Sequence, residues 1–236
     1  MLYGKKILVV VPARGGSKGV PKKNIYPILG KPLIAYTAQI LEQMDFFDEA
    51  ILSTDCSEIA KVAEGLGLVA PFLRPKELAS DVTGDLPVIE HALVEMERLH
   101  SCIFDYVVML QATCPLRYAS TVQEAVEKCV SQKLDSVWSV SQVDLKYHPL
   151  KQLQILGGTL ELFDQRGFEI TARQQLLPTY YRTGEVYVIA RDCVLNQRAM
   201  LGKKSGYVVS TTPQISIDTI QDIEIVEKLL RSRQVV

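Results

Sequence analysis

The chain has 236 residues, 47% of them hydrophobic, and its 26 Lys and Arg against 27 Asp and Glu give a net charge of −1. This length accommodates one sizeable α/β domain, no apolar run approaches a membrane span, and the charge provides no general attraction to nucleic acid or anionic lipid. The five cysteines have no C-x-x-C spacing and no secretory signal is recognisable, so we expect reduced thiols in a cytoplasmic protein.

Segments with strand character alternate with segments of helical periodicity. We expect strands at 6–11, 49–53, 105–110, 135–141, 185–190 and 206–210, and helices at 32–44, 56–66, 86–99, 120–131 and 219–232. This order predicts an α/β fold with a mostly parallel sheet flanked by helices, in a single domain over residues 1–236. Residues about 142–184 break the pattern, and we expect them to form a functional insertion of short β pieces.

The loop after the first strand carries the strongest functional signal. Residues 7–24 read ILVVVPARGGSKGVPKKN, a buried strand followed by three glycines and four cations. Glycines let a backbone approach a ligand and expose its N–H groups, and clustered cations repel one another unless an anion lies among them. The loop therefore predicts a polyphosphate site, although neither the P-loop pattern nor G-x-G-x-x-G fits it.

The next segments along the chain combine polar side chains with strand ends. Ser53-Thr54-Asp55 follows the second strand, and we interpret Asp55 as a helix N-cap. Residues 74–85, RPKELASDVTGD, form a polar loop before the third expected helix. The strand at 105–110 runs into Gln111, and Arg117 beyond it is either a surface charge or a functional cation.

Two polar features lie in the last third of the chain. His148 stands before a proline, where a packing role is more usual than a catalytic one, and no His has metal-ligand spacing. Near the C-terminus Asp222 has the spacing of a helix cap after Thr219. Asp218 stands at a strand end, where a carboxylate is able to bind a hard cation such as Mg²⁺.

Six segments in order resemble one family. The pattern A-R-x-x-S-K-G-x-x-x-K-N at 13–24 resembles the signature of the CMP-sialic acid synthetases (acylneuraminate cytidylyltransferases). The segments 74–81, 110–117, 148–151, 173–178 and 215–219 resemble further blocks of that family. Two departures stand out: Ser216 replaces the first aspartate of the family's I-D-I-D-T block, and Thr183-Gly184-Glu185 replaces Asn-Gly-x.

The resemblance implies a nucleotide-diphosphosugar-transferase-like (Rossmann-like) fold, a homodimer whose inserted arm reaches the neighbour's site, and Mg²⁺ as cofactor. It implies transfer from CTP to a nine-carbon keto-sugar acid, giving a CMP-sugar and pyrophosphate. N-acetylneuraminate is the expected acid. Legionaminic acid, pseudaminic acid and Kdo remain alternatives, and loss of catalysis through Ser216 would leave a nucleotide-binding regulator.

The same resemblance assigns roles to individual residues. The residues expected to bind CTP are Ala13, Arg14, Gly15, Gly16, Ser17, Lys18, Lys23, Asn24, Arg74 and Thr83. Arg14, Lys23 and Asp218 are the expected catalytic residues, with Asp218 and, more weakly, Ser216 at the metal. Gln111, Lys151, Arg173 and Tyr187 are expected at the sugar. The Arg74 guanidinium suits cytosine, because it is able to donate two hydrogen bonds to the ring nitrogen and carbonyl.

Overall fold

The computed structural model describes residues 2–233. The chain divides into two compact units, one formed by Met1–Ser139 with Thr183–Val236 and the other by Val140–Arg182. The second unit nearly coincides with the insertion expected at about 142–184. No helix among the described residues is long and apolar enough to cross a membrane.

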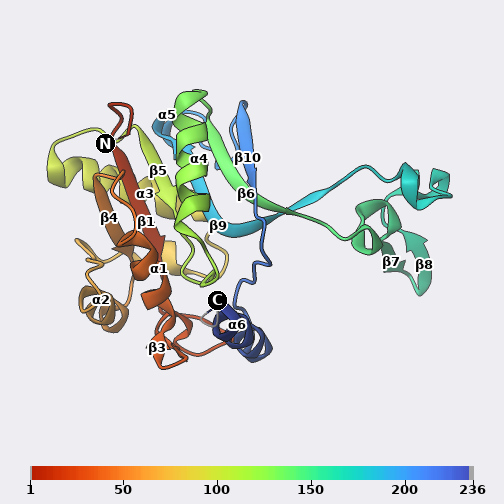
Figure 1. The fold of residues 1–236 in the computed structure, drawn as a ribbon, viewed down its shortest axis with the longest axis horizontal. Helices are drawn as coiled ribbons and strands as arrows, with labels where there is room; N and C mark the ends of the chain where they lie inside the picture. The colour runs from red at the N-terminus through yellow and green to blue at the C-terminus, as the bar shows by residue number, and fades with distance from the viewer. Residues whose placement is uncertain (1, 234–236) are drawn as a thin grey trace. The chain divides into compact units, whose positions relative to one another are not determined.

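A six-stranded sheet organises the first unit (Figure 1). Its order is β10-β6-β9-β5-β1-β4, with bounds Ser205–Val209, Ser136–Gln142, Tyr180–Ala190, Tyr106–Met109, Ile7–Pro12 and Glu49–Ser53. β1 is parallel to both β4 and β5, whereas β9 runs antiparallel to β5. The parallel strands are apolar and buried because helices cover both of their faces.

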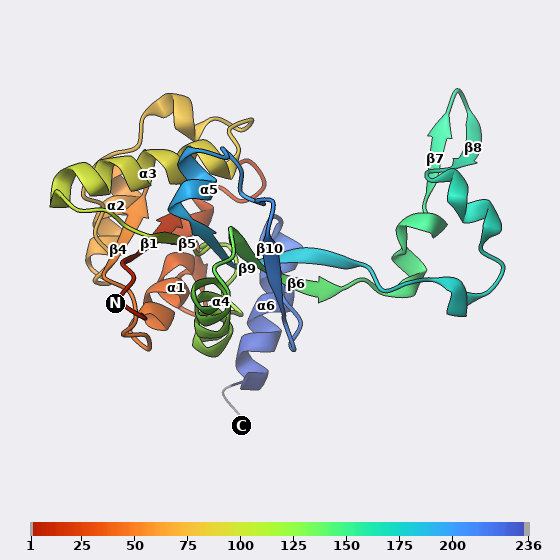
Figure 2. The ribbon, with the colours of Figure 1, turned by 90° about the horizontal axis from the view of Figure 1, so that it is seen from above.

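Helices cover the two faces of this sheet (Figure 2). On one face lie α1 (Leu33–Leu41), α2 (Ser57–Glu64) and α4 (Ala119–Ser131), packed on alternate β1 residues such as Val9. On the other lie α3 (Asp85–His100) and α5 (Arg191–Leu195), packed on the intervening residues such as Val10. This alternation is the two-residue period of a strand that is buried on both faces.

The C-terminal helix α6 (Ile220–Arg233) holds the segment before it against the loop after β1. Val226 and Leu230 of this helix share a core cluster with Val20, Leu116 and Ile217. The short strands β2 (Pro27–Ile28) and β3 (Lys31–Pro32) contribute Ile28 to the same cluster. Asp222 accepts hydrogen bonds from the Thr219 amide at 2.7 Å and the Asp218 amide at 3.0 Å, which confirms its predicted capping role.

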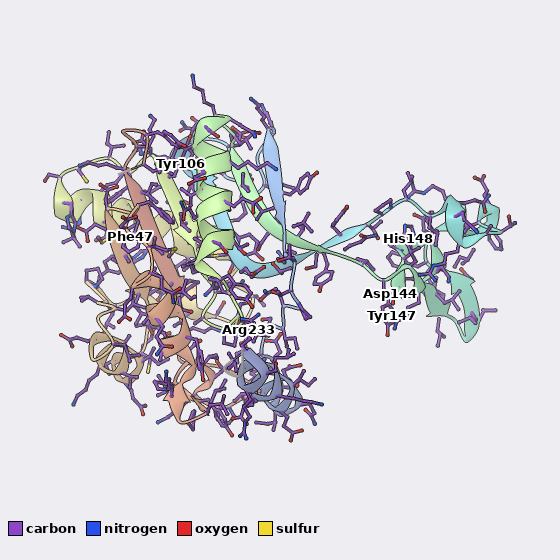
Figure 3. All side chains as sticks on the ribbon, viewed as in Figure 1. Phe47, Tyr106, Asp144, Tyr147, His148 and Arg233 are labelled. Carbon is purple, nitrogen blue, oxygen red and sulfur yellow. The ribbon has the colours of Figure 1, made fainter. Side chains whose placement is uncertain are left out.

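The second unit is built from one hairpin and short helical turns. β7 (Leu153–Leu156) pairs antiparallel with β8 (Thr159–Leu162) through Gly157 and Gly158, both at positive φ. Near the start of this unit, His148 Nδ1 accepts from the Leu150 amide at 3.2 Å and its Nε2 lies 3.0 Å from the Leu177 carbonyl (Figure 3). These bonds make His148 a packing residue, as the sequence predicted.

The long elements were predicted to within about three residues at each end, except that β9 begins five residues before its predicted start. The strands β7 and β8 agree with the short β pieces expected in the insertion. The other short elements were not predicted: α5, β2, β3, and the 3₁₀ turns at Lys23–Ile25, Lys76–Ala79, Leu145–Tyr147, Pro149–Lys151, Gln165–Glu169 and Arg173–Gln175. Cys129 lies in the core, and burial raises the pKa of its thiol to about 12. All five cysteines are free thiols.

Candidate active site

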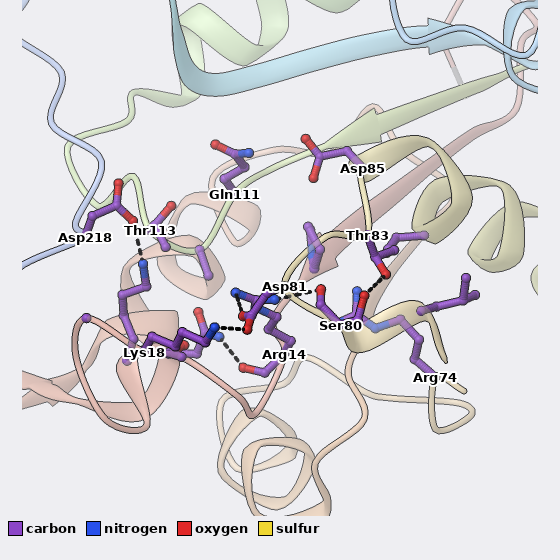
Figure 4. A pocket seen from close by; sticks show the side chains of 18 residues that line it. Arg14, Lys18, Arg74, Ser80, Asp81, Thr83, Asp85, Gln111, Thr113 and Asp218 are labelled. Atoms are coloured by element: carbon purple, nitrogen blue, oxygen red, sulfur yellow. Dashed lines mark hydrogen bonds and ion pairs between the residues drawn. The ribbon is translucent and has the colours of Figure 1, made fainter. Parts of the chain in front are cut away.

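A cavity of about 520 Å³ opens at the carboxyl ends of β1 and β5 (Figure 4). Ligands of open α/β sheets bind at this edge, because loops diverge there. Four segments of the first unit line it: the loop after β1, residues 74–88, residues 111–113, and Asp218. Its wall residues include Arg14, Ser17, Lys18, Gly19, Lys23, Asn24, Arg74, Ser80, Asp81, Thr83, Asp85, Gln111, Thr113 and Asp218.

Each of the four loop cations contacts a carboxylate. Asp81 pairs with Arg14 at 2.8 Å and with Lys18 at 2.5 Å, and the three side chains point toward one another in Figure 4. Lys22 pairs with Glu58 and Lys23 with Asp218, at 2.7 and 2.8 Å. The Lys18 hydrogen bond is the main reason that the pKa of Asp81 lies below its ordinary value. The loop's positive charge is therefore partly neutralised by the protein itself.

The backbone of the loop is fixed by side chains behind it. Asn24 donates to the Arg14 carbonyl at 2.9 Å, and the Gly15 amide donates to Asp55 Oδ1 at 2.9 Å. The prediction that Asp55 caps the following helix is wrong, because the N-cap is Cys56 and it makes no side-chain cap bond. Asp55 instead accepts the hydrogen bond of the Gly15 amide, which we had expected to bind a phosphate.

Arg74 presents two hydrogen-bond donors that no acceptor among the described residues satisfies. Its side chain lines the cavity yet is only 3% exposed, and its Nε and Nη2 are buried without a hydrogen-bond partner. Asp55 Oδ1 stands 4.0 Å from Nη2. Burial lowers the pKa of Arg74, and the charge of Asp55 opposes that effect. Nε and Nη2 form the side edge of the guanidinium, which matches a ligand with two adjacent acceptors.

The loop beside Arg74 is held by its own hydroxyl groups. Thr83 Oγ1 lies 2.7 Å from Ser80 Oγ and donates to the Glu77 carbonyl at 3.1 Å. The Ser80 carbonyl in turn accepts from Arg14 at 2.7 Å. Thr83 thus belongs to the cavity wall as predicted, and in this structure it also fixes the loop that carries Asp81.

Comparison with known proteins defines the family. A family model described as cytidylyltransferase matches residues 8–235. The chain belongs to the cytidylyltransferase family. It is 31% identical over 229 residues to pseudaminic acid cytidylyltransferase of Campylobacter jejuni, covering 96% of this chain and 97% of that protein. It is 33% identical over 234 residues to CMP-N,N'-diacetyllegionaminic acid synthase of Legionella pneumophila, covering 97% and 98%.

Two further comparisons extend this result. N-acylneuraminate cytidylyltransferase of Escherichia coli is 31% identical over 226 residues, 93% of this chain but 51% of that protein. A solved CMP:2-keto-3-deoxy-manno-octonic acid synthetase complexed with CTP has a TM-score of 0.73 at 17% identity, covering 97% of this chain and all of that one, and shares the fold. The chain is thus a nucleotidyltransferase of the CMP-nonulosonate synthetase family, which uses CTP and a sugar acid.

This cytidylyltransferase offers a metal one carboxylate and several hydroxyls. Asp218 is 74% exposed and paired with Lys23, whose Nζ also donates to the Ile217 carbonyl at 2.7 Å. Ser216 Oγ donates to Thr113 Oγ1 at 3.1 Å. The described residues contain no cluster of three or more His, Cys, Asp or Glu that would hold a metal. Mg²⁺ typically uses one or two carboxylates with substrate phosphates, so this donor set fits Mg²⁺ brought in with a nucleotide.

Several predicted residues lie off the cavity wall. Ala13 is buried in the core, and Gly15 and Gly16 are beside the wall rather than on it. Tyr187 is 3% exposed and packs edge-to-face on Trp138 at 5.1 Å between ring centroids, so the structure places it in the core and not at a sugar site. Lys151 and Arg173 line a small cavity inside the second unit, and their role at the sugar stays a prediction.

The sequence analysis missed the acidic part of the wall. Asp81 and Asp85 were inside the quoted segment 74–85 but were given no role, and Thr113 was overlooked. The signal that could have found these carboxylates was charge. Four clustered cations repel one another, so they need anions nearby even before a ligand binds.

Proposed function

We propose that this chain transfers CMP from CTP to the anomeric hydroxyl of a nine-carbon 2-keto sugar acid. The observation that carries the proposal is the pair of unsatisfied Arg74 donors in the cavity wall. Cytosine offers a carbonyl oxygen and an unprotonated ring nitrogen side by side, so it accepts both hydrogen bonds. Uracil has an N–H at that ring position and would leave one buried donor unpaired, which is costly.

In the proposed reaction the C2 hydroxyl oxygen of the sugar acid attacks the α-phosphorus of CTP. A bond forms between that oxygen and phosphorus, the α–β phosphoanhydride bond breaks, pyrophosphate leaves with the electron pair, and the hydroxyl proton passes to solvent water. Arg14, Lys18 and Lys23 stabilise the charge that grows on the leaving oxygens, because they are held beside the cavity before reaction. No protein nucleophile is required.

Asp218 would hold Mg²⁺ together with the CTP phosphates, and the Ser216 hydroxyl would contribute more weakly. When bound, the ion supplies Lewis-acid stabilisation of phosphoryl charge. For Asp218 to bind it, the Lys23 ammonium now 2.8 Å away must turn toward the phosphates. Lys23 therefore has two positions in the proposal, one on Asp218 and one on the triphosphate.

For the sugar, we place diacylamino acids of the pseudaminate or legionaminate type ahead of N-acetylneuraminate. The relatives named for these acids match nearly the full length of both chains, whereas this chain covers about half of the E. coli N-acylneuraminate enzyme. Gln111 in the wall suits a polyhydroxylated or amidated substrate, because its amide both donates and accepts hydrogen bonds.

We also propose a homodimer formed through the second unit. That unit exposes many large apolar side chains, including Ile155 at 75% and Leu160 at 63%, which are opposite each other in the hairpin. Apolar surface of this kind is usually covered by a partner.

Pyrophosphate release by the full-length protein tests the function. We expect turnover with CTP, Mg²⁺ and at least one acid from a panel of pseudaminate, legionaminate, N-acetylneuraminate and Kdo. UTP should be at least about tenfold poorer than CTP. The highest kcat/KM on Kdo would contradict the nine-carbon assignment, and CTP binding without turnover of any acid would favour the nucleotide-binding regulator.

A further inference from the structure

Arg117 is a buried cation that joins three elements behind the cavity. Its side chain is 2% exposed, so the surface-charge interpretation is wrong. Nε donates to the Glu185 carbonyl on β9 at 2.5 Å, and Nη1 donates to Thr37 Oγ1 on α1 at 3.1 Å. Nη2 donates to the Gln111 carbonyl at 2.7 Å. One planar group therefore sets the spacing between the end of β5 and the neighbouring strand.

The residue held by this group is the one whose side chain lines the cavity. The Gln111 carbonyl also accepts from the Cys114 amide at 3.1 Å. Across the strands, a Cβ at Gly184 would collide with the Gln111 amide oxygen and lie 2.8 Å from Cys114 Sγ, and Gly184 has φ of 79°. The bare Gly184 backbone thus packs directly on the Gln111 amide. Both the carbonyl and the amide of Gln111 are constrained.

The charge of Arg117 has a buried counterpart in Glu185, which is fully buried on β9. Its Oε2 accepts from Ser210 and, at 3.3 Å, from Thr183. Burial lowers the pKa of Arg117 and the Glu185 charge acts against this effect. A buried cation left without compensation is strongly destabilising. The Glu185 charge supplies part of that compensation through space, because the Arg117 hydrogen bond goes to the Glu185 backbone carbonyl and not to its carboxylate.

We propose that Arg117 is a positioning residue for the sugar-acid side of the reaction: it fixes Gln111 on the cavity wall, and Glu185 compensates its charge. This inference rests on the proposed function, in which Gln111 contacts the acid. Arg117 touches no substrate itself. Its loss should therefore affect use of the acid while leaving the triphosphate and base contacts of CTP, which lie on Arg14, Lys23 and Arg74, unchanged.

The decisive comparison uses two variants of the full-length protein. Arg117→Lys keeps the charge but loses the planar fork. Arg117→Met combined with Glu185→Gln removes both buried charges, so that neither is left uncompensated in the core. This double variant should therefore remain folded even though it lacks the hydrogen bonds of Arg117. We expect the KM for the acid to rise roughly tenfold or more in both, because displaced substrate-positioning groups cost rate steeply. The Kd for CTP, measured by calorimetry, should stay within about twofold of wild type by the same reasoning.

A second ion pair of the first unit provides the matched control. Glu97 accepts from Arg191 at 2.8 and 3.0 Å, away from the cavity wall. Arg191→Met with Glu97→Gln should lower Tm and leave both substrates' constants unchanged. If the double variant of Arg117 and Glu185 had both the Tm and the KM for the acid of wild type, the inference would be overturned, since Arg117 would then have only a structural role. A wild-type enzyme that neither binds nor turns over any acid would overturn the proposed function and this inference with it.

Discussion

At the scale of single residues, the site holds its own anions. Asp81 bridges Arg14 and Lys18, and Asp218 holds Lys23, so a triphosphate has to compete with carboxylates for these three loop cations of the cavity wall. These ion pairs keep the cations oriented toward one region and reduce their mutual repulsion. The expected consequence is that removing a carboxylate and removing a cation have opposite effects on CTP.

Asp81→Asn should tighten CTP binding. The Asp81 pairs are partly exposed, and ion pairs of this kind contribute little because water and salt screen them. The Kd for CTP should therefore fall by roughly two- to fivefold. Calorimetric titration with CTP measures this directly, and Glu58→Gln, which frees the neighbouring Lys22 instead, is the matched control. Weaker CTP binding in Asp81→Asn would show that the carboxylate assists the nucleotide.

Lys23→Ala should reduce kcat by roughly 10²-fold, the scale for losing one preorganised transition-state donor. Its neighbour Lys22 is not part of the cavity wall and pairs with Glu58, so Lys22→Ala should change kcat by less than about twofold. Steady-state pyrophosphate release compares the two variants, with Tm as a check on folding. Near-normal turnover of Lys23→Ala would place the triphosphate elsewhere.

Glu185 should make stability fall as pH rises. Burial raises the pKa of Glu185 above its ordinary value of 4.5, so the folded chain binds this proton more tightly than the unfolded chain. That stabilisation is fully present below the unfolded pKa and is lost as pH rises through the folded pKa. The free energy of unfolding of wild type relative to Glu185→Gln should therefore decrease between about pH 5 and pH 8. Urea denaturation of wild type and Glu185→Gln at these two pH values checks the sign of the change.

Asp222 provides the opposite case. Burial alone would raise the pKa of Asp222, but hydrogen bonds from Asp218 and Thr219 lower it overall. Its stabilisation is present above the unfolded pKa and lost as pH falls. Wild type relative to Asp222→Asn should thus lose stability on acidification. A pH-independent difference for Glu185→Gln would mean that this carboxyl titrates alike in both states.

At the scale of elements, the loop after β1 and the segment before α6 touch at Gly19. A Cβ there would collide with the Asp218 carbonyl oxygen, which belongs to the backbone. Gly19→Ala should therefore push the two segments apart, break the Lys23–Asp218 contact, and lower both Tm and kcat, the latter by roughly tenfold or more. Gly16→Ala meets no atom within 4 Å and should keep the Tm of wild type. Equal Tm values for the two variants would contradict the close approach.

The long elements were predictable because their apolar periodicity persists over several turns or over a whole strand. α5 spans only Arg191–Leu195, and β2 and β3 have two residues each, which is too short for any period to show. The order of elements also gave no sign that β9 runs antiparallel to β5.

The site was predictable where charge and glycine gather in one loop. Its acidic wall was not, because Asp81 meets Arg14 across 67 positions of the chain only after folding. Tyr187 was misplaced for a similar reason: its position on β9, next to Gly184 and Glu185, does not reveal which side of the sheet it faces, and that side packs on Trp138. Arg117 became interpretable only through partners on three different elements.

At the scale of the whole molecule, the second unit has too little core to stand alone. Its hairpin pairs Leu153 with Leu162 and Ile155 with Leu160, and cross-strand partners point to the same face of a hairpin. Leu153, Ile155 and Leu160 on that face are more than half exposed. A two-stranded hairpin is marginally stable in water without a covered apolar face, so a second copy of the chain is the partner that we expect.

Ile155→Lys combined with Leu160→Glu tests this assembly. The two charges face each other across the strands, so the hairpin keeps a favourable cross-strand pair while the face loses its apolar surface. Light scattering behind size-exclusion chromatography should give twice the chain mass for wild type and the mass of a single chain for the variant. Ile103, which is 63% exposed in the first unit, provides the control, because Ile103→Lys adds a charge outside this face and should leave the dimer intact. A dimer that survives the hairpin variant would assign the interface to another surface, and a monomeric wild type would contradict the homodimer itself.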